Sequence, residues 1–525
     1  MRVSVIDLGF NSVKLVNYYV NHDGTYKAYQ REGVKVRLGQ GLGKTGVLTQ
    51  ESIQRTIDAL RFFREIVNFQ SIERILPVAT SAVREAKNRD EFLKQVFQET
   101  RLRFRVLSDK EEALYSYLGA LQSTCLPTAL FFDLGGGSLE LVYTENCKVR
   151  NFISLPIGGL RLSQIYGGSD GTFSKKNYSN MERYLSEILP NRKGFGINLD
   201  ATLVGVGGTL RAIARYDQER SKYPLYKIHN YRIDLDDVRL ISKLFLKMTP
   251  TKIAKIDAVG TNRADTITAG SCVIKQLMQK LEFENVVVSA QGLREGVLSA
   301  YLVSLSKKYL SMYEIDQKNV EDYVKERCKP ALIPGYTYQL LKPLLSSGLL
   351  KNKEYEILAS AIKQVAVLPP VFNLNTLFYL ILDEDKAGLS HAEQLVLALS
   401  IIHMKKSKAA TWFFRRYRSI MHPQNKKSIQ KIAALLSLAE ILERAKIRTR
   451  ATKGSHKEIL LTMIPSKNIL PVKTIEIAIK LIQEAFDMRV NYSVSATPKT
   501  LARKAVAIRT QDSKTSALSS TMAPE

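Results

Sequence analysis

Cysteine is scarce in this chain, and its distribution excludes the cysteine-based ways of stabilising a fold. The 525 residues contain four cysteines, Cys125, Cys147, Cys272 and Cys328, which lie far apart. No two of them have the close spacing of a zinc-binding pair, and four thiols are too few for a disulfide-rich secreted scaffold. We therefore expect reduced, mostly buried cysteines in an intracellular protein.

Long hydrophobic runs are also missing. No apolar stretch approaches the roughly 20 residues that span a bilayer, and the N-terminus starts with a strand-like pattern instead of a signal peptide. Hydrophobic residues make up 45% of the chain and charged residues 24%, as in ordinary globular proteins. We expect a cytoplasmic protein of several domains that has no membrane segment.

Acidic residues are few compared with basic ones. The chain has 50 Asp and Glu residues against 77 Lys and Arg residues, which gives a formal net charge of +27. Such a field attracts polyanions, including nucleic acid, anionic membranes, nucleotides and polyphosphate. Charge alone does not choose among these partners.

One stretch, residues 131–143, combines a glycine turn with two carboxylates. An apolar run ends at Asp133, three consecutive glycines follow, and a returning apolar run carries Glu140. This pattern predicts a β-hairpin whose turn presents several backbone N–H groups to one anion, such as phosphate. Carboxylates beside a phosphate-binding turn favour a Mg²⁺ ion between them. The alternative is a plain glycine hairpin with two solvated acids.

A second copy of this pattern lies at the N-terminus. Residues 5–16 align with residues 131–142 without gaps, so that Asp7 matches Asp133 and Ser12 matches Ser138. A repeat of this kind indicates two similar domains that face each other across a cleft. We expect phosphate to bind between the two turns.

Three further stretches carry candidate functional groups. Arg84 follows a strand and lies one turn into a helix, so it marks either an anion site or an ordinary capped helix with a surface arginine. Ser108 and Glu111 have the spacing of a capping box, which leaves the neighbouring Glu112 available for chemistry. Residues 202–215 predict a strand, a glycine turn and a helix, which is another phosphate-cradling arrangement.

The region after about residue 307 changes to helical patterning with basic polar faces. We interpret it as a separate all-α region, whose lysine-rich helices either line a channel for a polyanion or are simply solvated. Residues 472–509 return to short strand-like segments. The Ser/Thr/Ala-rich tail, residues 511–525, is predicted to be disordered.

Six separated motifs, in order over roughly the first 300 residues, resemble the exopolyphosphatase/guanosine pentaphosphate phosphohydrolase (Ppx/GppA) family. They occupy residues 5–12, 79–84, 108–113, 133–140, 205–209 and 289–296. The resemblance implies an α/β fold of two actin-like (ribonuclease H-like) domains with an interdomain cleft, residues 1–124 and 125–306. It also implies a C-terminal all-α HD-like domain in residues 307–510. That region is degenerate, because the chain's only His-Asp dipeptide is His22-Asp23 in the first domain.

The resemblance also implies roles for individual residues. Glu112 matches the base that activates water, and Asp133, Glu140 and the repeat counterpart Asp7 match a Mg²⁺ site. The residues expected to bind phosphate are Asn11, Ser12, Arg84, Gly135, Gly136, Gly137, Ser138, Gly207, Gly208 and Thr209.

The implied activity is Mg²⁺-dependent release of terminal orthophosphate from inorganic polyphosphate. The alternatives are a pppGpp 5′-phosphohydrolase, or a polyanion or nucleotide sensor without turnover. The sensor is suggested by Phe10 and Leu114, which replace the serine and arginine common in the family. We expect a homodimer, and we consider nucleic acid a weaker partner because no recognised nucleic-acid motif is present.

Overall fold

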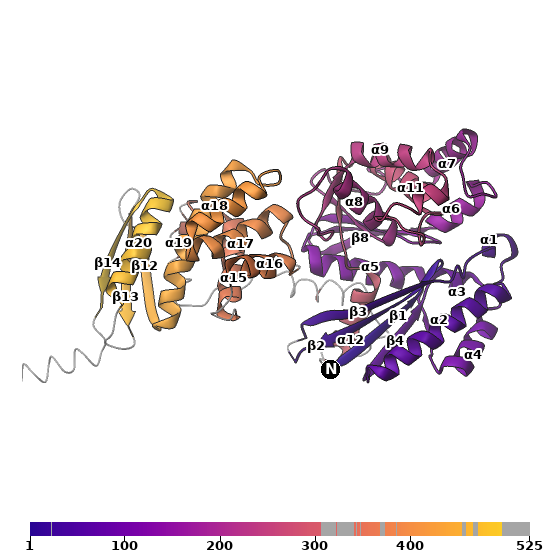
Figure 1. Cartoon of the computed structure of the whole chain (residues 1–525), viewed down its shortest axis with the longest axis horizontal. Coiled ribbons are helices and arrows are strands. Elements are labelled where there is room, and N and C mark those ends of the chain that lie inside the picture. The colour runs from indigo at the N-terminus through magenta and orange to yellow at the C-terminus, as the bar shows by residue number, and fades with distance from the viewer. Residues whose placement is uncertain are drawn as a thin grey trace, which may run out of the picture. The chain divides into compact units, whose positions relative to one another are not determined.

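The computed structural model describes the chain except for residue 23 and most of residues 306–343, with shorter gaps beyond. The described ranges are residues 1–22, 24–305, 322, 341–342, 344–346, 348–367, 373–384, 386–453, 458–465 and 471–495. The chain divides into two compact units, residues 1–329 with 385–390 and residues 330–384 with 391–525 (Figure 1). The tail predicted to be disordered lies outside the described residues. No helix in the described parts has both the length and the apolar character needed to cross a bilayer.

The first unit contains a five-stranded sheet in the order β3-β2-β1-β4-β5. Its strands are β1 (Arg2–Leu8), β2 (Ser12–Val20), β3 (Tyr26–Lys35), β4 (Arg74–Ala79) and β5 (Arg105–Val106). The helices of this half are α1 (Leu42–Thr45), α2 (Gln50–Phe69), α3 (Ser81–Glu85) and α4 (Arg89–Thr100). Strands β1 and β2 pair antiparallel, whereas β1, β4 and β5 run parallel. Apolar residues of β1 and β2 form one buried cluster with those of α2 and α4.

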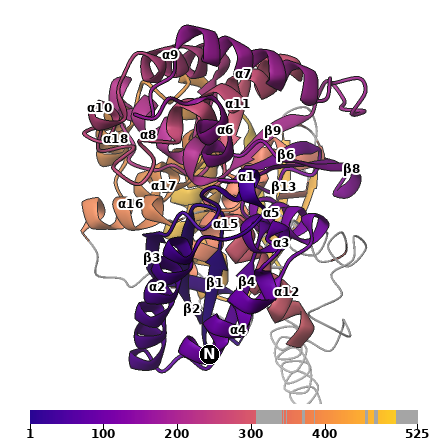
Figure 2. The same ribbon diagram turned by 90° about the vertical axis from the view of Figure 1, so that its right-hand side faces the viewer.

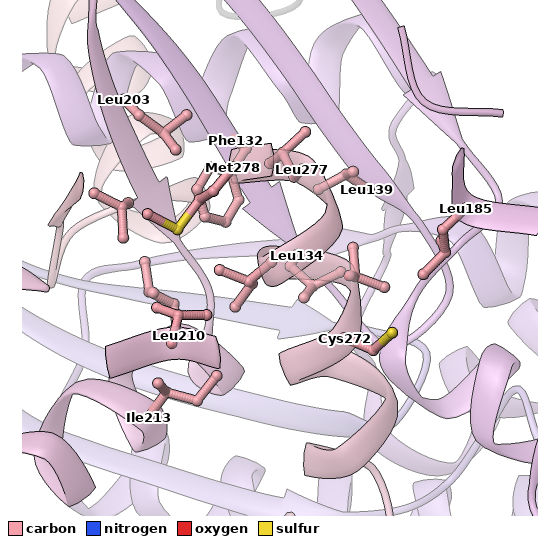
Figure 3. Packing of buried hydrophobic residues seen from close by; sticks show 14 of the residues in the cluster. Phe132, Leu134, Leu139, Leu185, Leu203, Leu210, Ile213, Cys272, Leu277 and Met278 are labelled. Atoms are coloured by element: carbon pink, nitrogen blue, oxygen red, sulfur yellow. The ribbon is translucent and has the colours of Figure 1, made fainter. Parts of the chain in front are cut away.

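A second, six-stranded sheet in the same unit has the order β10-β11-β9-β6-β7-β8. Its strands are β6 (Ala129–Leu134), β7 (Leu139–Glu145), β8 (Lys148–Leu155), β9 (Thr202–Val206), β10 (Arg232–Asp234) and β11 (Asn285–Val288). Its helices are α6 (Gly159–Tyr166), α7 (Lys175–Ile188), α8 (Gly208–Arg220), α9 (Leu235–Leu246), α10 (Pro250–Ile253) and α11 (Ile267–Lys280). Figure 3 shows the core of this half, where Phe132 and Leu139 from the hairpin strands lie among Leu210 of α8 and Leu277 of α11.

The two sheets confirm the sequence repeat at the level of backbone hydrogen bonds. Gly9 N donates to Ser12 O at 3.1 Å, and Gly135 N donates to Ser138 O at 3.0 Å, so the two turns close in the same way. Strand pairing then places Asp133 opposite Glu140 in one hairpin and Asp7 opposite Lys14 in the other. The N-terminal copy therefore has the first carboxylate, Asp7, but carries the amine of Lys14 where the second copy has the carboxylate of Glu140.

Two helices, α5 (Asp109–Thr124) and α12 (Leu293–Leu305), lie between the sheets (Figures 1 and 2). The predicted capping box at the start of α5 is confirmed, because Ser108 and Glu111 each hydrogen-bond the other's backbone N–H. The helices approach very closely: a Cβ added at Gly119 would lie 2.0 Å from Gly292 O, and one at Gly296 would lie 1.9 Å from Tyr115 O. Glycine is therefore required on both helices.

The second unit combines helices with a small sheet, so the prediction of an all-α domain is wrong. The helices are α15 (Asn352–Val367), α16 (Leu374–Asp383), α17 (His391–Lys405), α18 (Ser407–Arg416), α19 (Pro423–Arg444) and α20 (Val472–Phe486). Strands β12 (Ile447–Lys453), β13 (Glu458–Pro465) and β14 (Arg489–Val494) form the sheet, and α20 connects the parallel pair β13 and β14.

The predicted return to strand-like segments over residues 472–509 is also wrong for residues 472–486, which form α20. Its first half is rich in β-branched residues, which favour strands locally, but Ile475, Ile479 and Ile482 have helical spacing and are all buried. Tertiary burial of one face outweighs the local preference for a strand. The relation of this unit to HD domains stays a prediction.

The close helix contact gives the first testable prediction. We expect Gly296→Ala to lower the free energy of unfolding by about 1–3 kcal/mol, because its methyl group forces α5 and α12 apart. Gly43→Ala is the matched control, since its Cβ would meet only Arg161 Nη1 at 3.8 Å. Chemical denaturation of both variants measures the difference, and equal stabilities would contradict the assigned contact.

Candidate functional site

A cavity of about 870 Å³ lies in the first unit and is lined by residues of both sheets. The predicted phosphate-binding residues on its wall are Asn11, Ser12, Gly135, Gly136, Gly208 and Thr209. The two repeated turns and the turn before α8 therefore meet at one cavity, although they are far apart in sequence. The remaining predicted residues, Arg84, Gly137, Ser138 and Gly207, are not among its lining residues.

The glycine turn of the β6–β7 hairpin is anchored by the start of α6. Gly135 O accepts a hydrogen bond from Gly159 N at 3.0 Å, and Gly136 O accepts from Leu160 N at 3.0 Å. A Cβ at Gly158 would lie 2.3 Å from Gly136 C, so the two segments touch through backbone atoms. This packing fixes the turn in a single conformation at the edge of the cavity.

Eight Lys and Arg residues line the cavity, and three of them, Arg211, Arg263 and Arg294, lie close enough to Lys14 to affect its pKa. The pKa of Lys14 is lowered to about 8, mainly by burial, which Asp7 opposes and to which the three guanidinium groups add. Burial also lowers the pKa of Arg211 to about 10, helped by Arg294 and Arg263. Because these buried cations repel one another, their combined positive field attracts an anion strongly.

The sequence reasoning did not assign these cations to the site. Lys14 could have been predicted as a site residue, because the repeat aligns it with Glu140, a predicted metal ligand. Arg211 lies in the first turn of α8, directly after the predicted phosphate-cradling turn. Arg263 and Arg294 reach the cavity only through folding, since they come from a loop and from the start of α12.

Four carboxylates form a second, acidic cluster. Asp7, Glu112 and Glu140 are buried, with 8%, 9% and 2% of their surfaces exposed, and Asp133 is half-buried. Ser116 Oγ donates to Asp133 at 2.6 Å, and Ser154 Oγ donates to Glu140 at 3.2 Å.

The carboxylates perturb one another. Burial raises the pKa of Glu112 to about 7, Arg84 opposes the rise, and Asp133 and Asp7 add to it. Burial, followed by the charges of Glu112 and Asp133, raises the pKa of Glu140 well above its ordinary value. Burial likewise raises the pKa of Asp133. Groups perturbed in this way are typical of functional sites.

Arg84 orients Glu112. Its Nη1 donates to Glu112 Oε2 at 2.9 Å and to Leu107 O at 2.7 Å, while its Nη2 pairs with Asp109 Oδ1 at 2.5 Å. Ser154 Oγ also donates to Asp109 at 3.3 Å, which connects the Arg84 network to Glu140. The predicted contact of Arg84 with phosphate stays a prediction.

The acidic cluster borders the cavity. Arg294 Nε on the cavity wall lies 3.9 Å from Asp7 Oδ2. The charges of Lys14 and Arg211, also on the wall, oppose the rise in the pKa of Asp133. Charges of opposite sign therefore adjoin each other where the two sheets meet. This arrangement suits a substrate with several negative charges and a hydrolytic reaction at one of them.

The carboxylates suit a Mg²⁺ ion that also binds phosphate. Within the described residues no three His, Cys, Asp or Glu side chains converge to enclose a metal by themselves. Mg²⁺ commonly uses one or two carboxylates together with water and substrate phosphates. Asp133 and Glu140 face each other across a strand pair, and the buried Oδ1 of Asn11 has no hydrogen-bond partner among the described residues. These hard oxygen donors fit such an ion.

Phe10, which stands where the family commonly has serine, is part of the packing. Only 3% of its surface is exposed, and the Arg161 guanidinium carbon lies 5.0 Å from the centre of its ring. A Cβ at Gly39 or Gly137 would lie 2.2 Å and 2.5 Å from that ring, respectively. Arg161 also pairs with Glu85 at 2.6 Å. Phe10 therefore joins the two halves beside the glycine turn. Leu114 is likewise buried in an apolar cluster.

Comparison with known proteins agrees with the α/β architecture. The sequence profile of the Ppx/GppA phosphatase family matches residues 19–305. The chain is 31% identical over 311 residues to exopolyphosphatase 2 of Mycobacterium tuberculosis, covering 56% of this chain and 97% of that protein. It is 28% identical over 314 residues to a bifunctional 3-dehydroquinate synthase/phosphatase of Fusobacterium nucleatum, covering 58% of this chain and 46% of that protein's length.

A solved structure also has the α/β architecture of the first unit. The crystal structure of an exopolyphosphatase from Cytophaga hutchinsonii superimposes with a TM-score of 0.54 at 25% identity, covering 58% of this chain and 98% of that one. The predicted pair of α/β domains is therefore confirmed for the first unit.

The packing of Phe10 gives a prediction about stability. Phe10→Ser should lower the free energy of unfolding by about 3–5 kcal/mol, because it removes a buried ring and leaves a cavity. Phe69→Ser is the control, since Phe69 is 87% exposed and should change stability by less than about 0.5 kcal/mol. Denaturant titration compares the two variants. A Phe10 variant as stable as the control would mean that the ring does not hold the two halves together.

Proposed function

Because this chain belongs to the Ppx/GppA phosphatase family, we propose that it is an exopolyphosphatase, which hydrolyses the terminal phosphoanhydride bond of inorganic polyphosphate. One observation carries the proposal. The carboxylates around Glu112, which perturb one another's pKa, adjoin a cavity whose wall carries Lys14, Arg211, Arg263 and Arg294. A chain of phosphates presents several negative charges to such a wall, and hydrolysis at its end needs a positioned base.

Glu112 is the proposed general base. Its carboxylate takes a proton from the attacking water, whose oxygen forms the new bond to the terminal phosphorus. The bridging oxygen leaves with the shortened chain, and orthophosphate is the product. A pKa of about 7 makes Glu112 a stronger base than an ordinary carboxylate and leaves about half of it ionised at pH 7. Arg84 holds the carboxylate in position through their 2.9 Å hydrogen bond.

Mg²⁺ is the proposed cofactor, with one or two of the carboxylates Asp133, Glu140 and Asp7 as its protein ligands beside water and substrate phosphates. When bound, it would neutralise charge on the phosphate oxygens. Asn11, Ser12 and the glycine turns would hold the phosphates by hydrogen bonds. The expectations of a cytoplasmic homodimer belong to this proposal as well.

A pppGpp 5′-phosphohydrolase is the second candidate, and it is favoured by other residues on the cavity wall. Residues 226–229 and 257–262 contribute Tyr226 and Asn262, which suit a nucleoside more than a bare phosphate chain. A sensor without turnover is the third candidate. The ordered network around Glu112 argues against it, because a binding protein has no need of a poised base.

The first functional prediction concerns the base. Glu112→Gln and Glu112→Ala should each reduce Mg²⁺-dependent phosphate release from long-chain polyphosphate by about 10²–10⁴-fold, because neither side chain accepts the proton. The measurement is the initial rate of orthophosphate release.

Glu111→Gln is the matched control, because glutamine also serves in a capping box and Glu111 pairs with Arg105 away from the base. We expect it to keep most of the activity. Release from pppGpp alone would select the second candidate, and binding without release from either substrate would select the sensor.

The second functional prediction concerns pH. The rate should fall about tenfold per unit below pH 7, since the base form of Glu112 is then lost by protonation. Arg84→Met removes a positive charge that holds the pKa of Glu112 down, so the acid limb of the pH profile should move to higher pH. Arg89→Met, at an exposed pair with Asp90, is the control and should leave the limb in place. An unchanged limb in the Arg84 variant would show that another group limits the rate.

A further inference from the structure

Helix α18 of the second unit, together with the end of α17 before it and the start of α19 after it, presents a strongly basic surface that the proposed reaction does not use. We name it the α18 surface, and its exposed cations are Lys405, Lys406, Lys408, Arg415, Arg416, Arg418, Lys426 and Lys427. The chain contains no Asp or Glu between Glu393 and Glu440. Among the described residues, none of these eight side chains forms an ion pair with an acid. The charge therefore faces solvent without local compensation.

The only tryptophan of the chain lies in the middle of this surface. Trp412 is 55% exposed on α18, and the guanidinium carbon of Arg416 lies 5.7 Å from the centre of its ring. Lys408, Trp412 and Arg415 follow one another at helical spacing, and all three are exposed. A large aromatic side chain is thus kept in water between cations.

A layer of buried rings supports this tryptophan. Phe413 packs edge-on against Trp412 with ring centres 4.9 Å apart, and it stacks on Phe378 of α16 at 4.0 Å. Tyr379, which is 43% exposed, contacts Phe413 from α16 at 6.1 Å. Two partly exposed rings therefore flank one buried ring, which limits their motion and prepares them for stacking.

We propose that the α18 surface binds single-stranded nucleic acid, with a base stacked on Trp412 and the neighbouring phosphates held by the cations. A basic surface that carries exposed aromatic rings is typical of single-strand binding, because every base has a π-face. Inorganic polyphosphate has no ring to stack. Insertion into a membrane needs a contiguous apolar face, but Trp412 is the one exposed apolar side chain of α18, since Ala410 and Phe413 are buried and Ala409 and Phe414 are partly buried.

This inference departs from the sequence-based expectation, which disfavoured nucleic acid because no recognised motif is present. A motif search does not detect one exposed ring on a helix. The exposure of Trp412 and the burial of Phe413 beside it are properties of the folded unit.

Trp412 is also the reporter that tests the proposal, because it is the chain's only tryptophan. The full chain is titrated with a uridine-rich RNA, a thymidine-rich DNA, polyphosphate of equal phosphate number, and anionic phospholipid vesicles. We expect either oligonucleotide to quench the selectively excited emission of Trp412, as base stacking does, and polyphosphate to leave it unchanged. Quenching by polyphosphate alone, a blue shift with vesicles alone, or no response to either oligonucleotide would overturn the proposal.

Variants then separate stacking from charge. In fluorescence anisotropy with a labelled oligonucleotide, Trp412→Ala should weaken binding by about 5- to 150-fold, and Trp412→Phe should weaken it less. Arg415→Ala with Arg418→Ala should lower the slope of log affinity against log salt by about 0.7 for each phosphate that the variant no longer neutralises. The double variant Lys473→Ala with Lys480→Ala, exposed on α20, is the control and should bind as the wild type does. If Trp412→Ala also binds as the wild type does, the surface is not a stacking site.

Discussion

Burial of charge where the two sheets of the first unit meet is the constraint on which its site depends. A buried carboxylate or ammonium group loses its hydration, and it stays charged only beside compensating groups. Here four carboxylates adjoin four cations, and Arg294 and Asp7 approach across the boundary between them. The neighbouring carboxylates raise the pKa of Glu112, and the neighbouring guanidinium groups lower the pKa of Lys14. A bound chain of phosphates would complete this balance by compensating the cations on the cavity wall.

Backbone contacts hold these charges in place. Helices α5 and α12 approach where Gly119 meets Gly292 and Gly296 meets Tyr115, and this contact fixes the start of α12, which carries Arg294, against the middle of α5. On another side, Phe10 fills the space beside Gly137, and Arg161 lies over its ring while pairing with Glu85. Phe10 is therefore a packing residue between the halves, and the loss of a serine hydroxyl there does not remove the carboxylates from the site.

The second unit follows a different design. Its core consists of helices and a small sheet, and the cations of the α18 surface are exposed on its outside. The acids and cations of the first unit are organised around a cavity, whereas the α18 surface is open. Polyphosphate, which has no bases, would therefore bind in the cavity, whereas a nucleic acid would stack its bases on the open α18 surface.

The sequence alone determined much of the first unit, because its signals are local. The two glycine hairpins, the capping box at Ser108 and the strand–turn–helix around Gly207 follow from turn chemistry and capping within a few residues. The repeat then predicted two similar halves facing a cleft, and the comparisons confirm the α/β domains. The all-α prediction for the second unit failed because β12, β13 and β14 depend on pairing, and β13 and β14 are distant in sequence. The strand-like interpretation of residues 472–486 failed because burial of one face makes them the helix α20. Only the tertiary structure brought Arg263 and Arg294 beside Lys14 and left Trp412 exposed, since such juxtapositions depend on how elements pack and leave no periodic mark in the chain.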